Sequence, residues 1–378
     1  MEGTLAKFES MVENPYERLA QWKEETGNKI FGCLPMYFPE ELIHAAGILP
    51  IVLQESNELI TLGHARIQSF FCGIVRSLAD LVVKFKLDFL DGIVSPDICL
   101  AIRGLAAIAE MNMHCYHRKV FLPIAFQDHS DSRRFLIDEL NRFKKSLEEF
   151  TGQKITEGAL HKSFQLYNQH RALLREIYEL RRNKPGLLDS IEMRAIVGSS
   201  MLMPKEENNK LLTELISQLK DKEAPSDGRV KLVLSGSLCS ITPTDILNII
   251  EDAGAVIVDD DLYIGSRYFT WDVRTDGDPI EALAERHFQI LPPCPTRIDQ
   301  GNDWADYLLD IAKKSHTQGI IHLIVKYCQP HDLYYPYISH KLSDNGIPDL
   351  MIETEHEIIS TGQTKTRIEA FIEMIKGE

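Results

Sequence analysis

The feature that most constrains the fold is an alternation that occurs twice along the 378-residue chain. Short apolar runs of strand length alternate with stretches whose apolar residues recur at helical spacing. In the first half the runs are residues 29–35, 49–53, 89–94 and 119–125, and in the second half they are residues 230–236, 255–261, 319–327 and 348–355. Such alternation is typical of βαβ units, so we expect two parallel sheets with about four strands each.

The stretch between the two halves has a different pattern. Residues 131–222 are highly charged, and their apolar residues follow helical spacing, which predicts several helices. Turn-forming residues gather at 222–229 and indicate a linker. The predicted fold is therefore α/β, with two doubly wound, flavodoxin-like parallel-sheet domains and a helical segment between or against them. The predicted bounds are 1–130, 131–226 and 227–378.

Composition narrows the class of function. Asp and Glu total 56 and Lys and Arg total 41, so the chain carries −15 and would repel nucleic-acid phosphates. No signal peptide opens the sequence, and no apolar stretch approaches the roughly 20 residues that span a bilayer. Seven cysteines are too few for a disulfide scaffold. We therefore expect a cytoplasmic protein, in which cysteines serve more often as ligands or reactive thiols.

Three cysteines share one kind of setting. Cys72, Cys99 and Cys328 each precede a polar loop or helix start, and at least two follow a predicted strand. The carboxyl ends of strands are where open α/β sheets bind ligands. Three thiolates there could hold an iron–sulfur cluster with one open coordination position. The alternative is three ordinary buried cysteines, and no Cys-x-x-Cys pair decides between the two.

Residues near these cysteines are further candidates. His331 could donate a hydrogen bond to the cluster or relay a proton as a catalytic residue, or it could simply satisfy free amides at a helix start. Arg76 and Arg103 each stand four residues after a cysteine and could offset the cluster's negative charge, or form ordinary surface ion pairs. Cys239, at a predicted strand end, is a candidate neighbour of cluster or substrate.

The remaining signals are weaker. Gly236 and Ser237 could cradle an anion such as a CoA phosphate. The acidic run 259–261 could bind a metal, but acidic strand ends are common. For the other polar and thiol candidates an ordinary structural role is favoured; these are Cys33, His44, Cys115 and Cys294.

Several motifs, taken in order, give the chain a family resemblance. They are residues 39–50 (PEELIHAAGILP), 71–77 (FCGIVRS), 97–105 (DICLAIRGL), 328–336 (CQPHDLYYP) and 353–371, which holds ETE and GQTKTRIEAF. With this ordered set the chain resembles the 2-hydroxyacyl-CoA dehydratase and benzoyl-CoA reductase family, closest to the smaller, C-like benzoyl-CoA reductase subunits. One departure is Leu100, where the family often has an acidic residue after the second cysteine.

The resemblance implies a specific chemistry. It implies that Cys72, Cys99 and Cys328 bind a 4Fe-4S cluster, and it suggests that Gln363, Thr366 and Arg367 matter for the substrate or its surroundings. It also implies an oxidoreductase that reduces an acyl-CoA thioester to a ketyl radical anion, a homologous second catalytic subunit, and a separate ATP-hydrolysing iron–sulfur activator. This chain has no Gly-x-x-x-x-Gly-Lys-Ser/Thr loop, which fits an external ATPase.

Three alternatives stay open at this point. The chain could belong to a 2-hydroxyacyl-CoA dehydratase, which is a lyase that recycles its electrons. It could be a homodimeric double-cubane reductase, or a non-catalytic relative without a cluster. Since only three cysteines are well placed, we also hypothesise that the fourth iron has a ligand other than cysteine.

Overall fold

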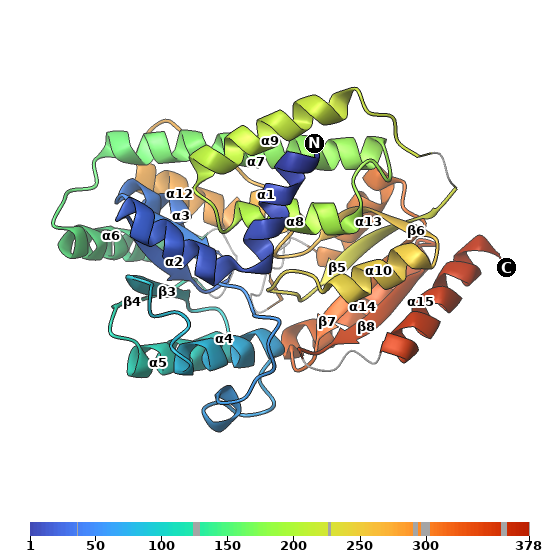
Figure 1. The fold of residues 1–378 in the computed structure, drawn as a ribbon, viewed down its shortest axis with the longest axis horizontal. Coiled ribbons are helices and arrows are strands. Elements are labelled where there is room, and N and C mark those ends of the chain that lie inside the picture. The colour runs from blue at the N-terminus through green and yellow to red at the C-terminus, as the bar shows by residue number, and fades with distance from the viewer. Residues whose placement is uncertain are drawn as a thin grey trace.

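The computed structural model describes residues 1–35, 37–123, 129–225, 228–289, 294–295, 303–356 and 361–377. Its strands form two four-stranded parallel sheets, which confirms the predicted fold class (Figure 1). The first sheet has the order β2-β1-β3-β4 and the second the order β6-β5-β7-β8. The strands are β1 (Lys29–Cys33), β2 (Ile48–Val52), β3 (Gly92–Pro96), β4 (Tyr116–Val120), β5 (Val230–Gly236), β6 (Ala255–Asp261), β7 (Gly319–Val325) and β8 (Asp349–Thr354).

Both sheets are covered on both faces. Ile30 and Phe31 are neighbours on β1, yet they belong to different hydrophobic clusters. On β5 the neighbours Leu232 and Val233 likewise enter separate clusters. Parallel strands that are buried on both faces read as continuous apolar runs, which is why the sequence shows them as runs without alternation.

Doubly wound topology creates a binding edge in each half. In each sheet the strand order reverses beside the first strand, between β1 and β3 and between β5 and β7. Ligands of open α/β sheets bind at such switch points, at the carboxyl ends of the strands. The loops that follow these strands therefore decide what the protein can bind.

The helices of the first half begin and end at identifiable residues. They are α1 (Glu2–Glu13), α2 (Pro15–Thr26), α3 (Glu40–Ala45), the 3-10 turn η1 (Gly63–Ala65), α4 (Gly73–Val83) and α5 (Leu100–Asn112). Cys72 keeps an extended backbone as the N-cap, so α4 begins at Gly73. The short α3 follows Pro39 and is succeeded by Gly47, whose φ of 76° ends the helix.

The predicted helical segment is present but shares its cores with the first sheet. It consists of α6 (Ser130–Thr151), α7 (Glu157–Asn183), α8 (Ser190–Ser200) and α9 (Lys205–Lys220). Figure 1 shows α7 and α9 stretching across both halves of the molecule. Phe143 of α6 packs with Phe31, and Ile177 of α7 packs in the cluster that holds Ile30. The domain bounds at 130 and 226 stay a prediction, and residue 226 lies outside the described residues.

The second half also reaches back to the first. Its helices are α10 (Thr244–Asp252), α11 (Ser266–Phe269), α12 (Pro279–Gln289), α13 (Trp304–Ser315), α14 (Gln329–Asp344) and α15 (Thr361–Lys376). Leu283 of α12 belongs to the same cluster as Phe31 and Phe143, so α12 ties the two halves together. Of the helices in the described parts of the chain, none combines the length and the apolar character that a membrane span needs.

Candidate functional site

Three cysteines occupy the same structural position in three different loops. Cys72, Cys99 and Cys328 are the N-cap residues of α4, α5 and α14. Each lies at the positive end of a helix, where the peptide dipoles favour a thiolate. The expectation that these residues stand at helix starts is met, and they come from both halves of the chain.

The structure also brings these thiols within electrostatic reach of one another. The pKa of Cys72 is raised to about 12, mainly by burial and next by the charge of Cys99. Burial raises the pKa of Cys328 as well, and the charge of Cys72 adds to the effect. Several buried thiols that disfavour each other's ionisation need a bound cation to become thiolates together, because a coordinating metal deprotonates a thiol outright.

The chemistry of these groups can be compared with the needs of a single metal ion and of a cluster. Among the residues that the structure describes, no three His, Cys, Asp or Glu side chains are placed to hold one ion. Thiolates on a single ion each lie about 2.3 Å from it and so must nearly touch. An iron–sulfur cluster places its own irons and sulfides between the ligands, so its cysteines stand further apart. The donor set of buried, mutually repelling thiols fits a cluster better than an ion.

Two more cysteines belong to this group of thiols. The charges of Cys328, Cys294, Cys72 and Cys99 all act to raise the pKa of Cys239, after burial as the main cause. Cys239 was a sequence candidate, whereas Cys294 was expected to be ordinary. Cys294 stands among prolines and follows no apolar run, so nothing in its local sequence indicated that it would lie near the other thiols.

His331 connects Cys328 to the protein interior. Its Nδ1 lies 3.2 Å from the Cys328 Sγ, and its Nε2 lies 3.2 Å from the Tyr263 hydroxyl. The ring is buried, and it stands edge-on to Trp304 with the ring centroids 5.1 Å apart. Burial lowers the pKa of His331 well below its usual range, and Arg267 lowers it further. A neutral ring with its proton on Nδ1 can donate to a Cys328 thiolate and accept from Tyr263.

The two arginines that follow cysteines have different surroundings. Arg76 is buried, donates through Nε to the Phe71 carbonyl at 2.9 Å, and forms an ion pair with Glu355, just after β8. Arg103 is 59% exposed and pairs with Asp97. Arg76 therefore joins the two halves beside Cys72, while Arg103 matches the alternative of a surface ion pair. A role for either arginine toward a cluster stays a prediction.

The Arg76–Glu355 pair supports a stability prediction. Arg76→Met should lower the free energy of unfolding by about 3 kcal/mol, because it leaves Glu355 partly buried without its counter-ion. Arg103→Met is the matched control, and it should leave the denaturant midpoint unchanged, because its ion pair is solvated. Guanidinium unfolding followed by circular dichroism measures both. Equal losses in the two variants would contradict this role of Arg76.

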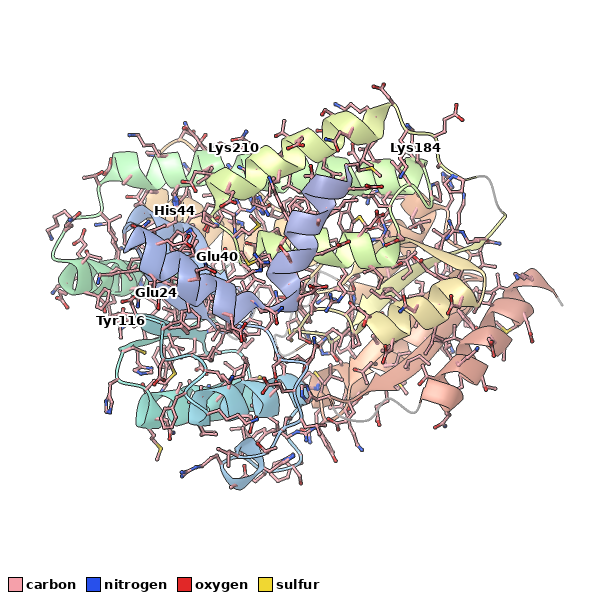
Figure 2. The ribbon with its side chains drawn as sticks, in the orientation of Figure 1. Glu24, Glu40, His44, Tyr116, Lys184 and Lys210 are labelled. Atoms are coloured by element: carbon pink, nitrogen blue, oxygen red, sulfur yellow. The ribbon has the colours of Figure 1, made fainter. Side chains whose placement is uncertain are left out.

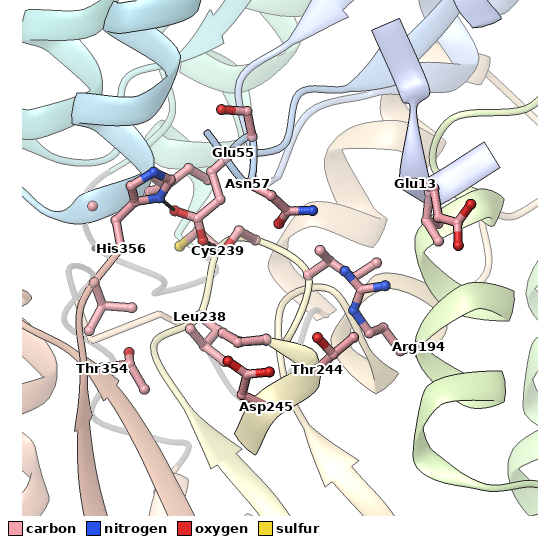
Figure 3. Close-up of a pocket in the computed structure, with 18 of the residues that line it drawn as sticks. Glu13, Glu55, Asn57, Arg194, Leu238, Cys239, Thr244, Asp245, Thr354 and His356 are labelled. Atoms are coloured by element: carbon pink, nitrogen blue, oxygen red, sulfur yellow. Dashed lines mark hydrogen bonds and ion pairs between the residues drawn. The ribbon is translucent and has the colours of Figure 1, made fainter. Parts of the chain in front are cut away.

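A cleft of about 770 Å³ opens beside the cysteines, where loops of both sheets meet (Figure 3). Its walls come from the loop after β2, the start of α4, and the carboxyl ends of β5, β7 and β8. Figure 3 shows Glu55, Cys239 and His356 on one side and Arg194, Thr244 and Asp245 on the other. Cys239 lines the cleft directly, so a molecule bound in it would reach the group of thiols.

The two halves approach each other closely at one wall of this cleft. Glu55 accepts a hydrogen bond from Ser240, and its other carboxylate oxygen lies 2.8 Å from His356 Nδ1. A Cβ on Gly73 would lie 2.9 Å from the Cβ of His356, so a side chain there would push the halves apart. Glycine at this position, directly after Cys72, therefore lets the start of α4 approach the end of β8.

Other sequence candidates lie elsewhere. Gln363 and Arg367 are exposed on α15 and do not line the cleft; Arg367 donates to the Met351 carbonyl at 2.8 Å. The Ser237 amide donates to the Leu323 carbonyl at 3.0 Å and its hydroxyl accepts from the Val325 amide, so both groups are used within the fold. Every carboxylate of the acidic run pairs with an arginine: Asp259 with Arg182, Asp260 with Arg181, and Asp261 with Arg267.

Comparisons with known proteins agree with this architecture. The pattern of the family described as "2-hydroxyglutaryl-CoA dehydratase, D-component" matches residues 35–375. The C-type benzoyl-CoA reductase subunit of Thauera aromatica is 30% identical over 351 residues, covering 91% of this chain and 90% of that protein. "Lactoyl-CoA dehydratase subunit beta" of Anaerotignum propionicum is 28% identical, with 99% of each chain covered. "(R)-2-hydroxyglutaryl-CoA dehydratase, subunit beta" of Acidaminococcus fermentans is 28% identical, covering 99% of this chain and 100% of that protein.

The family pattern begins after β1 and covers the other three strands of the first sheet and the whole second sheet. It also covers all three helix-start cysteines and the walls of the cleft after β5, β7 and β8. Reductase and dehydratase subunits are both among the relatives, at similar identity. The chain therefore belongs to the 2-hydroxyglutaryl-CoA dehydratase D-component family, which unites 2-hydroxyacyl-CoA dehydratase and benzoyl-CoA reductase subunits.

Proposed function

We propose that this chain is the iron–sulfur subunit of a benzoyl-CoA reductase-type enzyme. In this proposal Cys72, Cys99 and Cys328 hold one 4Fe-4S cluster, which supplies electrons one at a time at low potential. The observation that supports the proposal is that three helix-start thiols from both halves lie within electrostatic reach of one another, near an open cleft. The seven cysteines are all free thiols, as a reducing cytoplasm would keep them.

The surrounding residues would prepare this site in two ways. Three helix N-termini direct their dipoles toward the sulfurs and favour the thiolate forms. His331 would donate its Nδ1 hydrogen to Cys328, with Tyr263 holding the ring from the opposite side. Hydrogen bonds to a ligating sulfur, together with burial, set the potential of such a centre. The group of thiols includes Cys239, and a fourth ligand other than cysteine remains our hypothesis.

The substrate proposed for the cleft is an acyl-CoA thioester, with an aromatic acyl group. The cleft's volume of about 770 Å³ is large enough for a drug-sized ligand. Its charged lining is mostly acidic, so CoA phosphates would stay outside while the uncharged pantetheine arm and acyl group enter. The position of Cys239 in the wall would bring a thioester near the group of thiols.

The proposal also requires partners, because the sequence has no P-loop to bind ATP. We infer a homologous second catalytic subunit and a separate ATP-hydrolysing iron–sulfur activator. The test is anaerobic purification of the natural complex, with iron and sulfide analysis and identification of any chain that copurifies. Turnover of benzoyl-CoA by the purified chain alone, with ATP and a chemical reductant, would contradict the multi-subunit proposal and favour a homodimeric enzyme. A colourless, iron-free protein would favour a non-catalytic relative.

A 2-hydroxyacyl-CoA dehydratase is the second candidate, and the names of the relatives favour it. Lactoyl-CoA and (R)-2-hydroxyglutaryl-CoA dehydratase beta subunits align over nearly the whole chain. The two functions differ in electron use, because a reductase consumes reductant with each turnover and a dehydratase recycles its electron. Measuring reductant consumed per product formed, with benzoyl-CoA and with 2-hydroxyacyl-CoA thioesters, separates them.

A further inference from the structure

A second, smaller cavity lies in the polar interior, apart from the cleft. It has a volume of about 70 Å³ and shares no lining residue with the cleft. Residues from the start of α3, from α7 and from α11 enclose it. Figure 2 shows Glu40, one of its lining residues, deep among the helices on that side of the molecule. Its polar lining includes Tyr37, His170, Arg171, Tyr263, Arg267 and Arg286.

The charges around this cavity leave a positive excess. Glu41 is paired with Arg171, Asp261 with Arg267, and Glu40 with Lys205 at 3.5 Å. Arg286 is a fourth cation, and its Nε donates to the Trp271 carbonyl at 2.8 Å. No carboxylate in the described part of the chain forms an ion pair with Arg286. The pKa of this guanidinium is lowered to about 10, mainly by burial and next by the charge of Arg171, although Glu41 and Glu40 act in the opposite direction.

Two buried polar atoms at the cavity have no hydrogen-bond partner among the described residues. One is Nη1 of Arg267, whose residue is 6% exposed and whose Nε and Nη2 both donate to Asp261. The other is Nε2 of His170, whose residue is 1% exposed. Leaving such groups unpaired in the interior is unfavourable, so their pairing with a ligand would stabilise the folded protein.

The hydrogen bonds of Asn209 determine which ring nitrogen of His170 carries the proton. The Asn209 amide nitrogen donates to the Leu166 carbonyl at 3.3 Å, so its oxygen faces Nδ1 of His170, at 2.8 Å. His170 must therefore carry its proton on Nδ1, which leaves Nε2 as a bare acceptor. The cavity thus presents a cationic donor from Arg267 and a neutral acceptor from His170.

We propose that this cavity binds a small monoanion with a carboxylate-type group and a hydroxyl, of which hydrogencarbonate is the simplest. Its charged oxygens would accept hydrogen bonds from Arg267, and its negative charge would balance the positive charge of Arg286. Its hydroxyl would donate to Nε2 of His170. A cavity of 70 Å³ accommodates roughly five water-sized spheres, which suits an anion of a few heavy atoms and excludes an acyl-CoA. Anion binding here does not depend on the function proposed for the cysteines.

The test is calorimetric titration of the whole chain, without added cluster, at mildly alkaline pH and constant ionic strength. The probes are sodium hydrogencarbonate, glycolate, acetate and chloride, and thermal unfolding is followed in parallel. We expect saturable one-to-one binding of hydrogencarbonate or glycolate with a rise in unfolding temperature, weaker binding of acetate, which lacks the hydroxyl, and none of chloride. Comparing the affinities of glycolate and hydrogencarbonate shows whether the site prefers an organic hydroxy acid or the inorganic ion.

Variants locate the site. Arg267→Lys keeps a charge for Asp261 but removes the spare Nη1, and His170→Phe removes the acceptor; each should weaken binding by about tenfold or more. Arg175 lies on the same helix as His170 and forms an ion pair with Asp272. The control variant Arg175→Lys should bind the anions as the wild type does. Equal, non-saturable effects of all four salts would mean an adventitious ion only and would overturn the proposal. If a variant fails to fold, the selectivity of the wild-type protein among the four anions still tests the proposal.

Discussion

Serine in place of Cys72, Cys99 or Cys328 should reduce the iron content of anaerobically purified protein from about four atoms per chain to below one. A hydroxyl does not replace a thiolate as a cluster ligand, and two remaining cysteines hold a cluster poorly. The measurements are iron and acid-labile sulfide per chain, together with the electron paramagnetic resonance spectrum of the dithionite-reduced protein.

Cys115→Ser is the matched control for these variants. Cys115 is half-buried in the first half, and its Sγ lies 3.6 Å from His117 Nε2. The Cys115→Ser protein should therefore retain its full iron content. Cys239→Ser tests the fourth coordination position, and we expect it to keep the iron as well. Full iron content in all three single variants at Cys72, Cys99 and Cys328 would refute the ligand assignment, and loss of iron in Cys239→Ser would refute a non-cysteine fourth ligand.

Arg171→Met should lower the free energy of unfolding by about 3–5 kcal/mol, because it leaves a buried carboxylate without its partner. Arg171 and Glu41 are 4% and 1% exposed, and they form an ion pair between α7 and α3. On the same helix, Arg175→Met removes a solvated ion pair with Asp272 and should cost no more than about 1 kcal/mol. Urea unfolding of both variants provides the comparison.

The pH dependence of this loss has a definite sign. Burial raises the pKa of Glu41, but Arg171, Arg286 and hydrogen bonds together more than offset it, so the pKa lies below its ordinary value. The stabilisation is therefore fully present above about pH 4.3, the unfolded value, and is lost as the pH falls through the lowered pKa. Arg171→Met removes the largest of the opposing causes, so the pKa of Glu41 should rise and the variant's deficit should shrink on acidification. A deficit independent of pH would show that lost packing, and not the ion pair, causes it.

Local sequence decided much of the fold. The strands at 230–236 and 255–261 have the predicted bounds. The strands expected at 89–94 and 119–125 instead lie at Gly92–Pro96 and Tyr116–Val120. Both shifts follow from pairing, since Gly92 must stand opposite Phe31 and also opposite Tyr116 for the ladder to form. Register between strands is a long-range property that an apolar run cannot specify.

For the candidate site, the sequence by itself indicated that Cys99 and Cys328 follow strands, because an apolar run followed by a polar turn marks the carboxyl end of a strand. It also determined the family, through an ordered set of motifs. Only the tertiary structure decided that Cys294 lies near the other thiols, that Arg76 reaches Glu355 across the halves, and that Arg267 and His170 border one cavity. These groups lie far apart in the chain. Their proximity comes from packing the two sheets and the helices around them together, which no local pattern encodes.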